Sequence, residues 1–426
     1  MSRAAVRPGR ALRGDATLPG DKSITQRAIF LGALAPGTTR IRNANRGTDA
    51  AAALGMVRAL GVPVRRERDG TLLLRGGTMR ESDRVLQARN SGTALRLATG
   101  LLSAQPFQSV LTGDASLRRR PVDRVLRPLA AFGADLSARE EGRLPPVLVR
   151  GRRLHGAVVD TGVPSAQVKG ALLLAAVQAE GDSVVRESVA TRDHTERMLP
   201  AFGGVIAAEG GSIRVEGSAR LHGADVAVPG DASAAAFLAA AAALVPRSDV
   251  RLRGVSVNPT RRAFFDILAR MGAIVTFDEE GAVGGEPIAD VRIRAGSLRP
   301  VSVAADGVPA LIDELPLVAV LAAFAPGVSE VTGAGELRVK ESDRIDAVTE
   351  ALRAVGASVE PLHDGWRVDG RAALAGGDVE TRGDHRIAMA FLVAGLRARR
   401  GVRVDCAEAI AVSDPGFLPR LRSLSR

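Results

Sequence analysis

One pattern occurs six times along the chain: a helix made almost entirely of apolar residues, followed by a turn and a short strand. The copies begin roughly 70 residues apart, which is too long for a solenoid repeat and long enough for a whole supersecondary unit. A helix that is apolar on all sides must be buried on all sides, so each group of copies should wrap its strands around buried helices. The six copies lie at residues 28–41, 94–111, 171–185, 234–252, 318–331 and 390–404.

A second, amphipathic helix alternates with the apolar one. Five times it ends in a large apolar residue, a glycine and a small residue, and a strand-like run follows. Because glycine readily adopts the left-handed backbone that ends helices, these glycines are predicted to be C-caps. They are Gly61, Gly133, Gly203, Gly272 and Gly356.

The length of 426 residues exceeds what one ordinary hydrophobic core supports, so two domains are expected. Six copies divide into two lobes of three, with a break near Val228-Pro229-Gly230. A strand at residues 11–18 precedes the first copy, and by count it belongs with the C-terminal copies. We therefore predict one lobe from residues 1–19 plus 229–426 and another from residues 20–228.

Composition narrows the classes of function. Aromatic residues make up 3%, with no Tyr and one Trp, which argues against a single-stranded nucleic-acid binder that needs stacking platforms. The net charge of +11 indicates an anionic partner. A lone Cys406 fits a reducing compartment, and neither metal-ligand spacing nor a signal peptide is visible. The longest apolar run, residues 232–246, is shorter than the roughly 18 residues of a membrane span. We expect a soluble, cytoplasmic protein without metal or cofactor.

A polar cluster stands at the entrance of each apolar helix. Ser, Thr, Asp and Asn at such positions are ordinary N-caps. Lys22, Arg27, Lys169 and Arg386 are not, because a cation is disfavoured at the positive end of a helix dipole. An anion held between these cations and the helix ends would compensate them. The clusters therefore predict a cleft for a small molecule with several negative charges. They are Gly20–Ser23, Asn90–Thr93 with Arg96, Ser165–Gln167 with Lys169, Gly230–Ser233, Asp313-Glu314 and Asp384–Arg386.

The use of lysine supports the same interpretation. Lys and Arg together number 58, yet only Lys22, Lys169 and Lys340 are lysines. Lysine is a compact, titratable point charge, whereas arginine is a planar and permanently charged fork. Lys340 lies in the charged stretch 337–344, just before an amphipathic helix. The three retained lysines therefore mark candidate sites.

These motifs together resemble the 3-phosphoshikimate 1-carboxyvinyltransferase family, also called EPSP synthases. The resemblance covers nearly the whole chain, with the motifs in family order. The motifs are residues 18–23 with Arg27, 90–94, Arg120-Pro121, 165–167, 338–344 and 384–386. Four further stretches resemble the bacterial class II branch of the family, namely residues 20–23, 165–169, 192–196 and 258–261.

The resemblance implies a fold and an activity. The fold is an α/β enolpyruvyl transferase fold of two lobes, each built from three βαβαββ units with strands around buried parallel helices, an inside-out α/β barrel. The activity is transfer of the enolpyruvyl group of phosphoenolpyruvate to the 5-hydroxyl of shikimate 3-phosphate, in the shikimate pathway to chorismate and aromatic amino acids. Neither a cofactor nor a nucleic-acid or membrane partner is implied, and we expect a monomer.

The resemblance also implies roles for individual residues. Asp313 is the candidate base and Glu341 the candidate acid, with Lys22 bridging the two substrates; the acid and base roles could be exchanged. Shikimate 3-phosphate would be held by Lys22, Ser23, Arg27, Ser165, Ala166, Gln167, Arg192, Asp313 and Lys340. Phosphoenolpyruvate would be held by Lys22, Gly92, Arg120, Gln167, Arg344 and Arg386.

Two departures and two alternatives accompany the resemblance. Many class I members carry a lysine where this chain reads Ala411–Pro415, and glyphosate-tolerant class II members often have Ala at the position of Gly92.

The sister transferase for UDP-N-acetylglucosamine typically has Lys-Asn where this chain has Lys22-Ser23, and usually a Cys in the loop that here spans residues 114–120. A basic nucleic-acid binder, or an RNA-end cyclase of related units, is opposed by the scarcity of aromatics and the lack of a nucleotide phosphate loop.

Overall fold

The computed structural model describes residues 2–371 and 373–425, and the chain divides into two compact units. Unit 1 comprises Met1–Pro19, Pro229–Ala282 and Pro287–Arg426, and unit 2 comprises Gly20–Val228 and Val283–Glu286. Each unit has its own hydrophobic core. The prediction placed residues 283–286 with the C-terminal lobe, whereas this four-residue turn belongs to unit 2.

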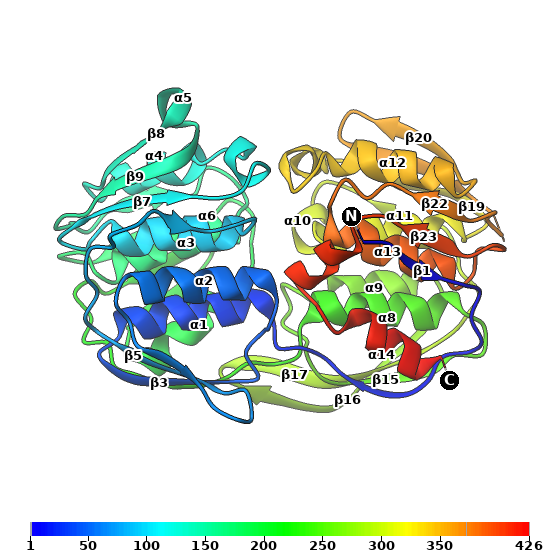
Figure 1. Ribbon diagram of the computed structural model, residues 1–426, viewed down its shortest axis with the longest axis horizontal. Coiled ribbons are helices and arrows are strands. Elements are labelled where there is room, and N and C mark those ends of the chain that lie inside the picture. The colour runs from blue at the N-terminus through cyan, green and yellow to red at the C-terminus, as the bar shows by residue number, and fades with distance from the viewer. Residues whose placement is uncertain (1, 372, 426) are drawn as a thin grey trace. The chain divides into compact units, whose positions relative to one another are not determined.

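Six helices form the interiors of the units, three in each (Figure 1). Every residue of α3, α8, α11 and α13 is buried, which confirms that the all-apolar helices are enclosed. In unit 1, α8, α11 and α13 pack against one another, and in unit 2, α3 packs against both α1 and α6. The six helices are α1 (Lys22–Leu34), α3 (Gly92–Leu102), α6 (Ala166–Ala176), α8 (Ala232–Leu244), α11 (Leu315–Ala323) and α13 (His385–Gly395).

A second set of helices is amphipathic, as predicted. α12 buries Ile345, Val348 and Leu352, and its opposite face is exposed. The five glycines predicted as C-caps all have left-handed backbone, with φ between +83° and +100°. Gly203 follows a 3-10 turn, η2 (Leu199–Phe202), rather than an α-helix. The set comprises α2 (Thr48–Ala59), α4 (Asp123–Ala130), α7 (His194–Met198), α9 (Ala263–Arg270), α12 (Arg344–Ala354) and α14 (Phe417–Leu424).

The three sheets of unit 2 share one topology. In each, the strand after the buried helix pairs in parallel with one neighbour and antiparallel with the other. The first sheet has the order β14 (Asp225–Ala227), β3 (Gly37–Arg42), β5 (Leu72–Gly76), β4 (Val64–Arg66). The second has β6 (Leu86–Gln87), β7 (Gln108–Thr112), β9 (Leu144–Arg150), β8 (Asp135–Ala138), and the third β10 (Val158–Asp160), β11 (Ser183–Arg186), β13 (Ser212–Val215), β12 (Ile206–Glu209).

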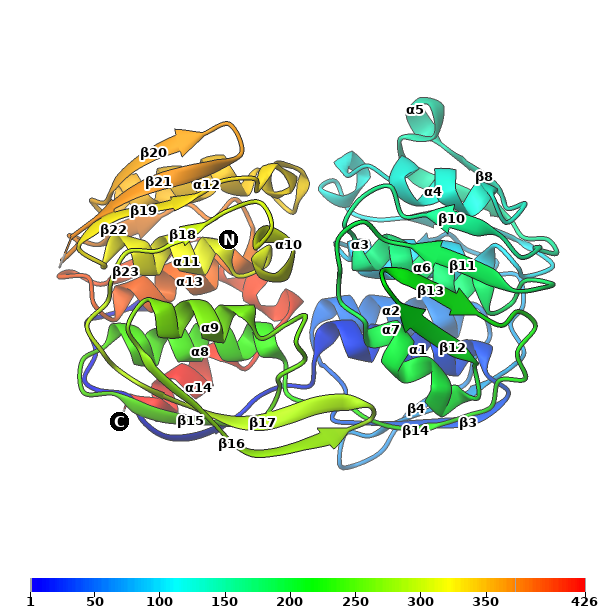
Figure 2. The same ribbon diagram turned by 180° about the vertical axis from the view of Figure 1, so that it is seen from behind.

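Unit 1 repeats this topology, and Figure 2 shows its strands from behind, outside the stack of α8, α11 and α13. β2 (Arg13–Thr17) pairs in parallel with β15 (Asp249–Ser256), so the strand expected near residues 11–18 lies with the C-terminal copies. That sheet continues through β17 (Glu286–Arg294) to β16 (Ile274–Val283). The next contains β18 (Ser302–Val303), β19 (Gly327–Val331), β21 (Gly365–Gly370) and β20 (Ser358–Leu362).

The sixth sheet differs from the predicted βαβαββ unit. It has three strands, β22 (Gly377–Val379), β23 (Val402–Val404) and β1 (Ala4–Val6). β1 comes from the other end of the sequence and pairs antiparallel with β23, in the position that a hairpin strand takes in the other five sheets. Short helical segments complete the structure: α5 (Arg139–Gly142), α10 (Val308–Leu311), η1 (Leu117–Arg119), η3 (Gly335–Val339) and η4 (Ala407–Val412).

Candidate active site

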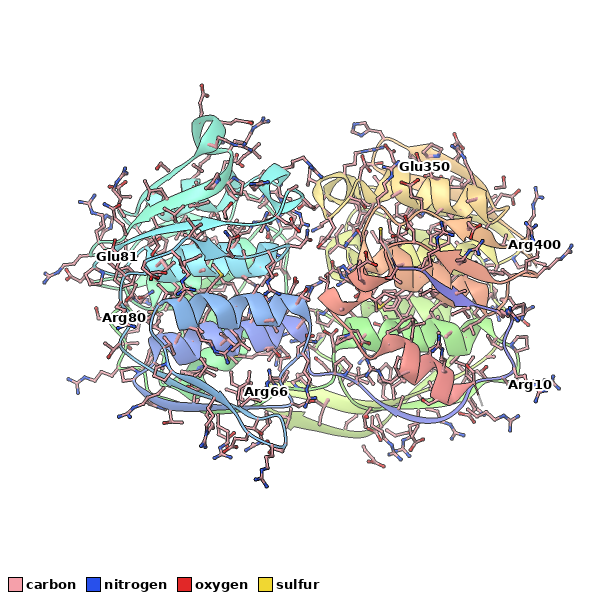
Figure 3. The ribbon with its side chains drawn as sticks, in the orientation of Figure 1. Arg10, Arg66, Arg80, Glu81, Glu350 and Arg400 are labelled. Carbon is pink, nitrogen blue, oxygen red and sulfur yellow. The ribbon has the colours of Figure 1, made fainter. Side chains whose placement is uncertain are left out.

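Arginines divide into two classes by burial. Most charged side chains stand on the surface, as Arg66 and Arg400 do in Figure 3. Six arginines of the described residues are buried, and each lies in the first two turns of a helix or within three residues before an α-helix. Burying a cation is costly unless it is paired, so these positions are candidates for function. They are Arg27, Arg96, Arg120, Arg261, Arg344 and Arg386.

The buried helices begin at polar caps, as the sequence predicted. Five of the six start after an Asp or Ser side chain that accepts a backbone N–H bond, and the exception is α11, where Glu314 makes no such bond. Asp313 is therefore not a helix cap, and His385 follows the residue that caps α13. The five caps are Asp21, Ser91, Ser165, Asp231 and Asp384.

In unit 2, Arg27 connects three segments that are distant in sequence. Its Nε donates to Thr195 Oγ1 at 2.9 Å, its Nη2 to the Ala166 carbonyl at 2.9 Å, and its Nη1 to the Ser23 carbonyl at 3.2 Å. Burial lowers the pKa of the Arg27 guanidinium to about 10, and the nearby charge of Arg192 acts in the same direction. Four of the predicted substrate-binding residues therefore lie in one neighbourhood.

Lys22 stands beside these residues at the start of α1. Its Nζ lies 2.9 Å from Asp49 Oδ2, in the first turn of α2. The Lys22 side chain is 15% exposed. Sequence reasoning missed Asp49, which looks like an ordinary acidic residue in the first turn of a helix.

Gln167 is held in one orientation by its neighbours. Its Oε1 accepts from Arg96 Nη1 at 2.5 Å, and its Nε2 donates to Thr93 Oγ1 at 3.0 Å. Arg96 is fixed in turn by the Pro121 carbonyl at 3.0 Å. The sequence placed Arg96 in a polar cluster without a role, and the structure makes it the group that orients the Gln167 amide.

Arg120 and Gly92 lie next to this amide. Arg120 Nη2 donates to Asn90 Oδ1 at 2.6 Å, which fixes the guanidinium before α4. A Cβ atom built on Gly92 would lie 3.6 Å from Arg120 Nη1 and 3.7 Å from Gln167 Oε1. Gly92, Arg120 and Gln167, all predicted to contact phosphoenolpyruvate, are therefore neighbours.

Lys169 corrects one sequence-based interpretation. Its predicted compensation was a bound anion, but its Nζ pairs with Glu187 at 2.9 Å and Glu196 at 2.7 Å, and its side chain is 2% exposed. The burial that hides this pair raises the pKa of the Glu196 carboxyl, against the opposing charge of Lys169. The charge of Lys169 is therefore balanced by these two glutamates and is not presented to a ligand.

In unit 1, Arg344 is surrounded by carboxylates. Its Nε donates to Asp384 Oδ2 at 2.8 Å and its Nη2 to Glu341 Oε2 at 2.6 Å, while Nη1 lies 3.7 Å from Asp313 Oδ1. Burial alone would lower the pKa of Arg344, but Asp384 and Glu341 raise it above its ordinary value. For Asp384 the two effects have the opposite signs: burial alone would raise its pKa, but the charge of Arg344 lowers the pKa below its ordinary value.

Arg386 brings a second guanidinium to Asp313. Its Nη1 donates to the Asp313 carbonyl at 2.9 Å, and its Nη2 lies 3.4 Å from Asp313 Oδ2. The candidate base therefore lies between two arginines that were predicted to bind phosphoenolpyruvate. Asp313, Glu341, Arg344 and Arg386 therefore form one cluster of charged side chains.

Lys340 lies close to the same cluster. A quarter of its side-chain surface is exposed, and its Nζ lies 3.7 Å from Glu336 Oε1. Burial lowers the pKa of the Lys340 ammonium. The charge of Arg344 lowers it further, whereas the carboxylates of Glu336 and Asp313 oppose the shift. A lysine with a lowered pKa next to paired arginines is typical of a functional site.

A second buried network in unit 1 was not predicted. Ser233 Oγ donates to Glu314 Oε1 at 2.5 Å, Arg261 Nη2 lies 3.5 Å from the same oxygen, and Arg386 Nη1 lies 3.6 Å from it. Glu314 is therefore a second carboxylate partner of Arg386, beside Asp313. The sequence offered a signal, because Ser233 lies in the polar cluster 230–233 and Arg261 in the stretch 258–261, but nothing in their spacing connected the two.

Residues 411–415, where many class I members carry a lysine, contain Asp414, which forms an ion pair. The Asp414 carboxylate accepts from the backbone of Gly416 at 3.0 Å and pairs with Arg420 of α14. Within residues 2–371 and 373–425, no group of His, Cys, Asp and Glu is arranged to hold a metal ion. None of the described helices is both long and apolar enough to cross a membrane.

Comparison with known proteins gives the family. The model of the family described as EPSP synthase (3-phosphoshikimate 1-carboxyvinyltransferase) matches residues 6–421. The chain belongs to the EPSP synthase family. A 3-phosphoshikimate 1-carboxyvinyltransferase of Halorhodospira halophila is 48% identical over 422 residues, which cover 98% of this chain and 95% of the relative.

Solved structures agree with this family membership. The EPSP synthase structure from Acinetobacter baumannii superposes with a TM-score of 0.87 at 41% identity, covering 100% of this chain and 98% of that one. The enolpyruvyl transferase NikO of Streptomyces tendae has a TM-score of 0.77 at 20% identity, covering 98% and 96%, a likeness that shows the fold alone. The predicted enolpyruvyl transferase fold is thereby confirmed.

Proposed function

We propose that this EPSP synthase family member transfers the enolpyruvyl group of phosphoenolpyruvate to the 5-hydroxyl of shikimate 3-phosphate. The products are 5-enolpyruvylshikimate 3-phosphate and phosphate, in the shikimate pathway to chorismate and aromatic amino acids. The observation that carries the proposal is the full-length family match together with the cluster in unit 1, where two buried arginines flank Asp313. Paired guanidinium groups suit a substrate that carries both carboxylate and phosphate.

Shikimate 3-phosphate is assigned to the Arg27 neighbourhood and to Lys340. Arg27 keeps its position through Thr195 and Ala166, so it is held ready for an anion before one binds. The full set for this substrate is Lys22, Ser23, Arg27, Ser165, Ala166, Gln167, Arg192, Asp313 and Lys340.

Phosphoenolpyruvate is assigned chiefly to three arginines, Arg120, Arg344 and Arg386. Bidentate guanidinium contacts hold a carboxylate or phosphate in one plane, and three arginines can share its charges. Gly92 leaves space beside Arg120 and Gln167. The full set for this substrate is Lys22, Gly92, Arg120, Gln167, Arg344 and Arg386.

Asp313 and Glu341 are assigned the proton transfers, and Lys22 is assigned the bridge between the two substrates. Asp313 takes the proton of the 5-hydroxyl as its oxygen attacks C2 of phosphoenolpyruvate, and Glu341 gives a proton to the methylene carbon. The tetrahedral intermediate then returns a proton from the new methyl group to the Glu341 carboxylate, while the C–O bond to phosphate breaks and phosphate leaves. Both carboxylates contact Arg344, which steadies the changing charges during these steps.

A phosphate-release assay tests the proposal. Purified protein is supplied with phosphoenolpyruvate and either shikimate 3-phosphate or UDP-N-acetylglucosamine. We expect phosphate release only with shikimate 3-phosphate, and release with the nucleotide sugar would assign the chain to the sister reaction. The monomeric state and the cytoplasmic location stay predictions, which sedimentation and fractionation can test.

A further inference from the structure

The turn between β16 and β17 is seated in unit 2 by two glycines. Gly284 and Gly285 have left-handed backbone, with φ of +58° and +80°. A Cβ on either would lie 2.9 Å from a carbonyl oxygen, that of Ala227 for Gly284 and that of Arg197 for Gly285. Arg197 Nη1 also donates to the Gly285 carbonyl at 3.3 Å. Such close backbone approach at positive φ requires glycine, so the turn has one defined seat.

This seat delivers Glu286 to a buried histidine. Glu286 Oε1 lies 2.7 Å from His194 Nδ1, and the two side chains are 2% and 0% exposed. This separation is that of a short hydrogen bond between the two side chains. A buried carboxylate that lost this partner would pay a large desolvation cost, so the pair holds the turn and the histidine together.

His194 stands in the middle of a segment that the proposed mechanism uses. Arg192 lies two residues before it, and Thr195, the acceptor of Arg27 Nε, directly follows it. Glu196 is the next residue and pairs with Lys169. Residues 192–196 are therefore anchored at His194 and Glu196. Two other groups of the segment act on Arg27: Thr195 accepts its hydrogen bond, and the charge of Arg192 lowers its pKa.

We propose that Glu286 is a positioning residue for shikimate 3-phosphate, which fixes Arg192 and Thr195 by holding His194. Glu286 does not itself touch the substrate in this scheme. The inference rests on the proposed function, because it requires that Arg27 and Arg192 hold this substrate. It assigns a role to a residue that lies outside every motif of the family resemblance.

The test compares Glu286→Ala, Glu286→Gln and a matched control, Glu280→Ala. Glu280 lies on the same hairpin and is exposed. For each protein we would measure the Kd for shikimate 3-phosphate alone by calorimetry, the KM values for both substrates, kcat and Tm. A loss of folded protein lowers kcat, whereas a displaced Arg192 or Thr195 raises the Kd and KM for shikimate 3-phosphate selectively.

We expect Glu286→Ala to raise the Kd and KM for shikimate 3-phosphate about tenfold or more, because small displacements of a positioned group are costly. The KM for phosphoenolpyruvate should stay within about twofold, Glu280→Ala should match the wild type, and Glu286→Gln, which keeps the shape and an acceptor, should be intermediate. If Glu286→Ala does not fold, Glu286→Gln decides.

Three results would overturn the inference. They are a wild-type Kd in the folded variants, equal rises of both KM values, and the same effect in Glu280→Ala. These results are distinguishable from failure of the proposed function, because that failure is seen in the wild-type protein, as an absence of turnover with shikimate 3-phosphate and phosphoenolpyruvate.

Discussion

Replacing Gly92 by alanine tests the placement of the phosphoenolpyruvate residues in unit 2. Gly92 is the first residue of α3, and its backbone is not in the left-handed region, so alanine is allowed there. The added Cβ would lie 2.7 Å from Arg96 Nη1, closer than real contacts permit, and the guanidinium must shift. Because the same Nη1 donates to Gln167 Oε1, the shift also disturbs the Gln167 amide.

The expected effect on stability is small. Alanine favours a helix over glycine by roughly 0.5–1 kcal/mol. Weakening a hydrogen bond made by a charged group costs at most about 1.5–3 kcal/mol. The free energy of unfolding should therefore fall by about 1–2 kcal/mol, which lowers Tm by a few degrees in a protein of this size.

The expected effect on ligands is larger and selective. The methyl group would lie at ordinary contact distance from Arg120 and Gln167, in space proposed for phosphoenolpyruvate. The family resemblance implies that glyphosate competes with phosphoenolpyruvate, and glyphosate is the longer molecule. One methyl group in a binding site discriminates by about 1–3 kcal/mol, so the glyphosate inhibition constant should rise about 10–200-fold. The KM for phosphoenolpyruvate should rise less than about tenfold, because the smaller ligand needs less of this space.

The assay is a pair of glyphosate inhibition curves at fixed phosphoenolpyruvate, wild type against Gly92→Ala. Gly55→Ala is the matched control, because Gly55 is an exposed glycine of α2 whose added Cβ would meet nothing within 4 Å. Control and wild-type curves should coincide. Superimposable curves for Gly92→Ala and wild type would refute the reasoning and remove the Asn90–Thr93 segment from the phosphoenolpyruvate site.

Three further predictions concern the charged residues. Asp313→Asn should still fold, since Asp313 caps no helix and Arg344 and Arg386 each keep another carboxylate partner, yet lose about 10²–10⁴-fold in kcat, and near-normal turnover would move the base role elsewhere. Lys22→Arg should lower kcat about tenfold or more, because a longer planar fork cannot keep the 2.9 Å contact with Asp49 and the same charge position; wild-type turnover would contradict this. The lowered pKa of Lys340 means that its charge is lost at lower pH than in an ordinary lysine, so the KM for shikimate 3-phosphate should rise with pH through that range. Lys340→Arg should move this rise to higher pH, and an unchanged pH profile would remove Lys340 from the binding site.

Much of the fold could be predicted from the sequence, because the six interior helices are recognisable as almost entirely apolar segments. A segment such as α8, in which all thirteen residues are buried and nine are alanine, cannot lie on a surface. The five glycine C-caps were equally visible. The order of strands could be predicted only in part: the count of units placed β2 with the C-terminal copies, but nothing indicated that β1 pairs with β23, hundreds of residues away.

The candidate site was predictable to the extent that polar residues break an apolar pattern. That signal found Arg27 and Arg386, whereas the role expected of Arg344 came from the family resemblance. It could not separate cations that meet a ligand from cations that meet a buried carboxylate, which is why Lys169 was misinterpreted. That distinction depends on which segments pack together, and sequence spacing does not contain it.

Partners of the site residues were the least visible. Asp49 and Glu286 lie in other segments than the motifs they contact, and each looks like an ordinary acidic residue of a helix start or a hairpin. Their roles arise only when the chain has folded. A pattern search along the sequence therefore finds the residues proposed to touch substrate more readily than those that hold them.

The pairing of β2 with β15 sets an order for folding on the ribosome. Asp15 and its partner Arg253 are separated by 238 residues, which take roughly ten to fifty seconds to synthesise at ordinary rates. Throughout that time β2 must wait without a partner. Its sequence suits the delay, because Arg13 and Asp15 are charged and exposed, and such residues protect an unpaired strand from aggregation. Unit 2 has nearly all of its residues by Val228, but it receives Glu286 only when the hairpin emerges. A nascent chain stopped between these two points would therefore carry His194 without its carboxylate.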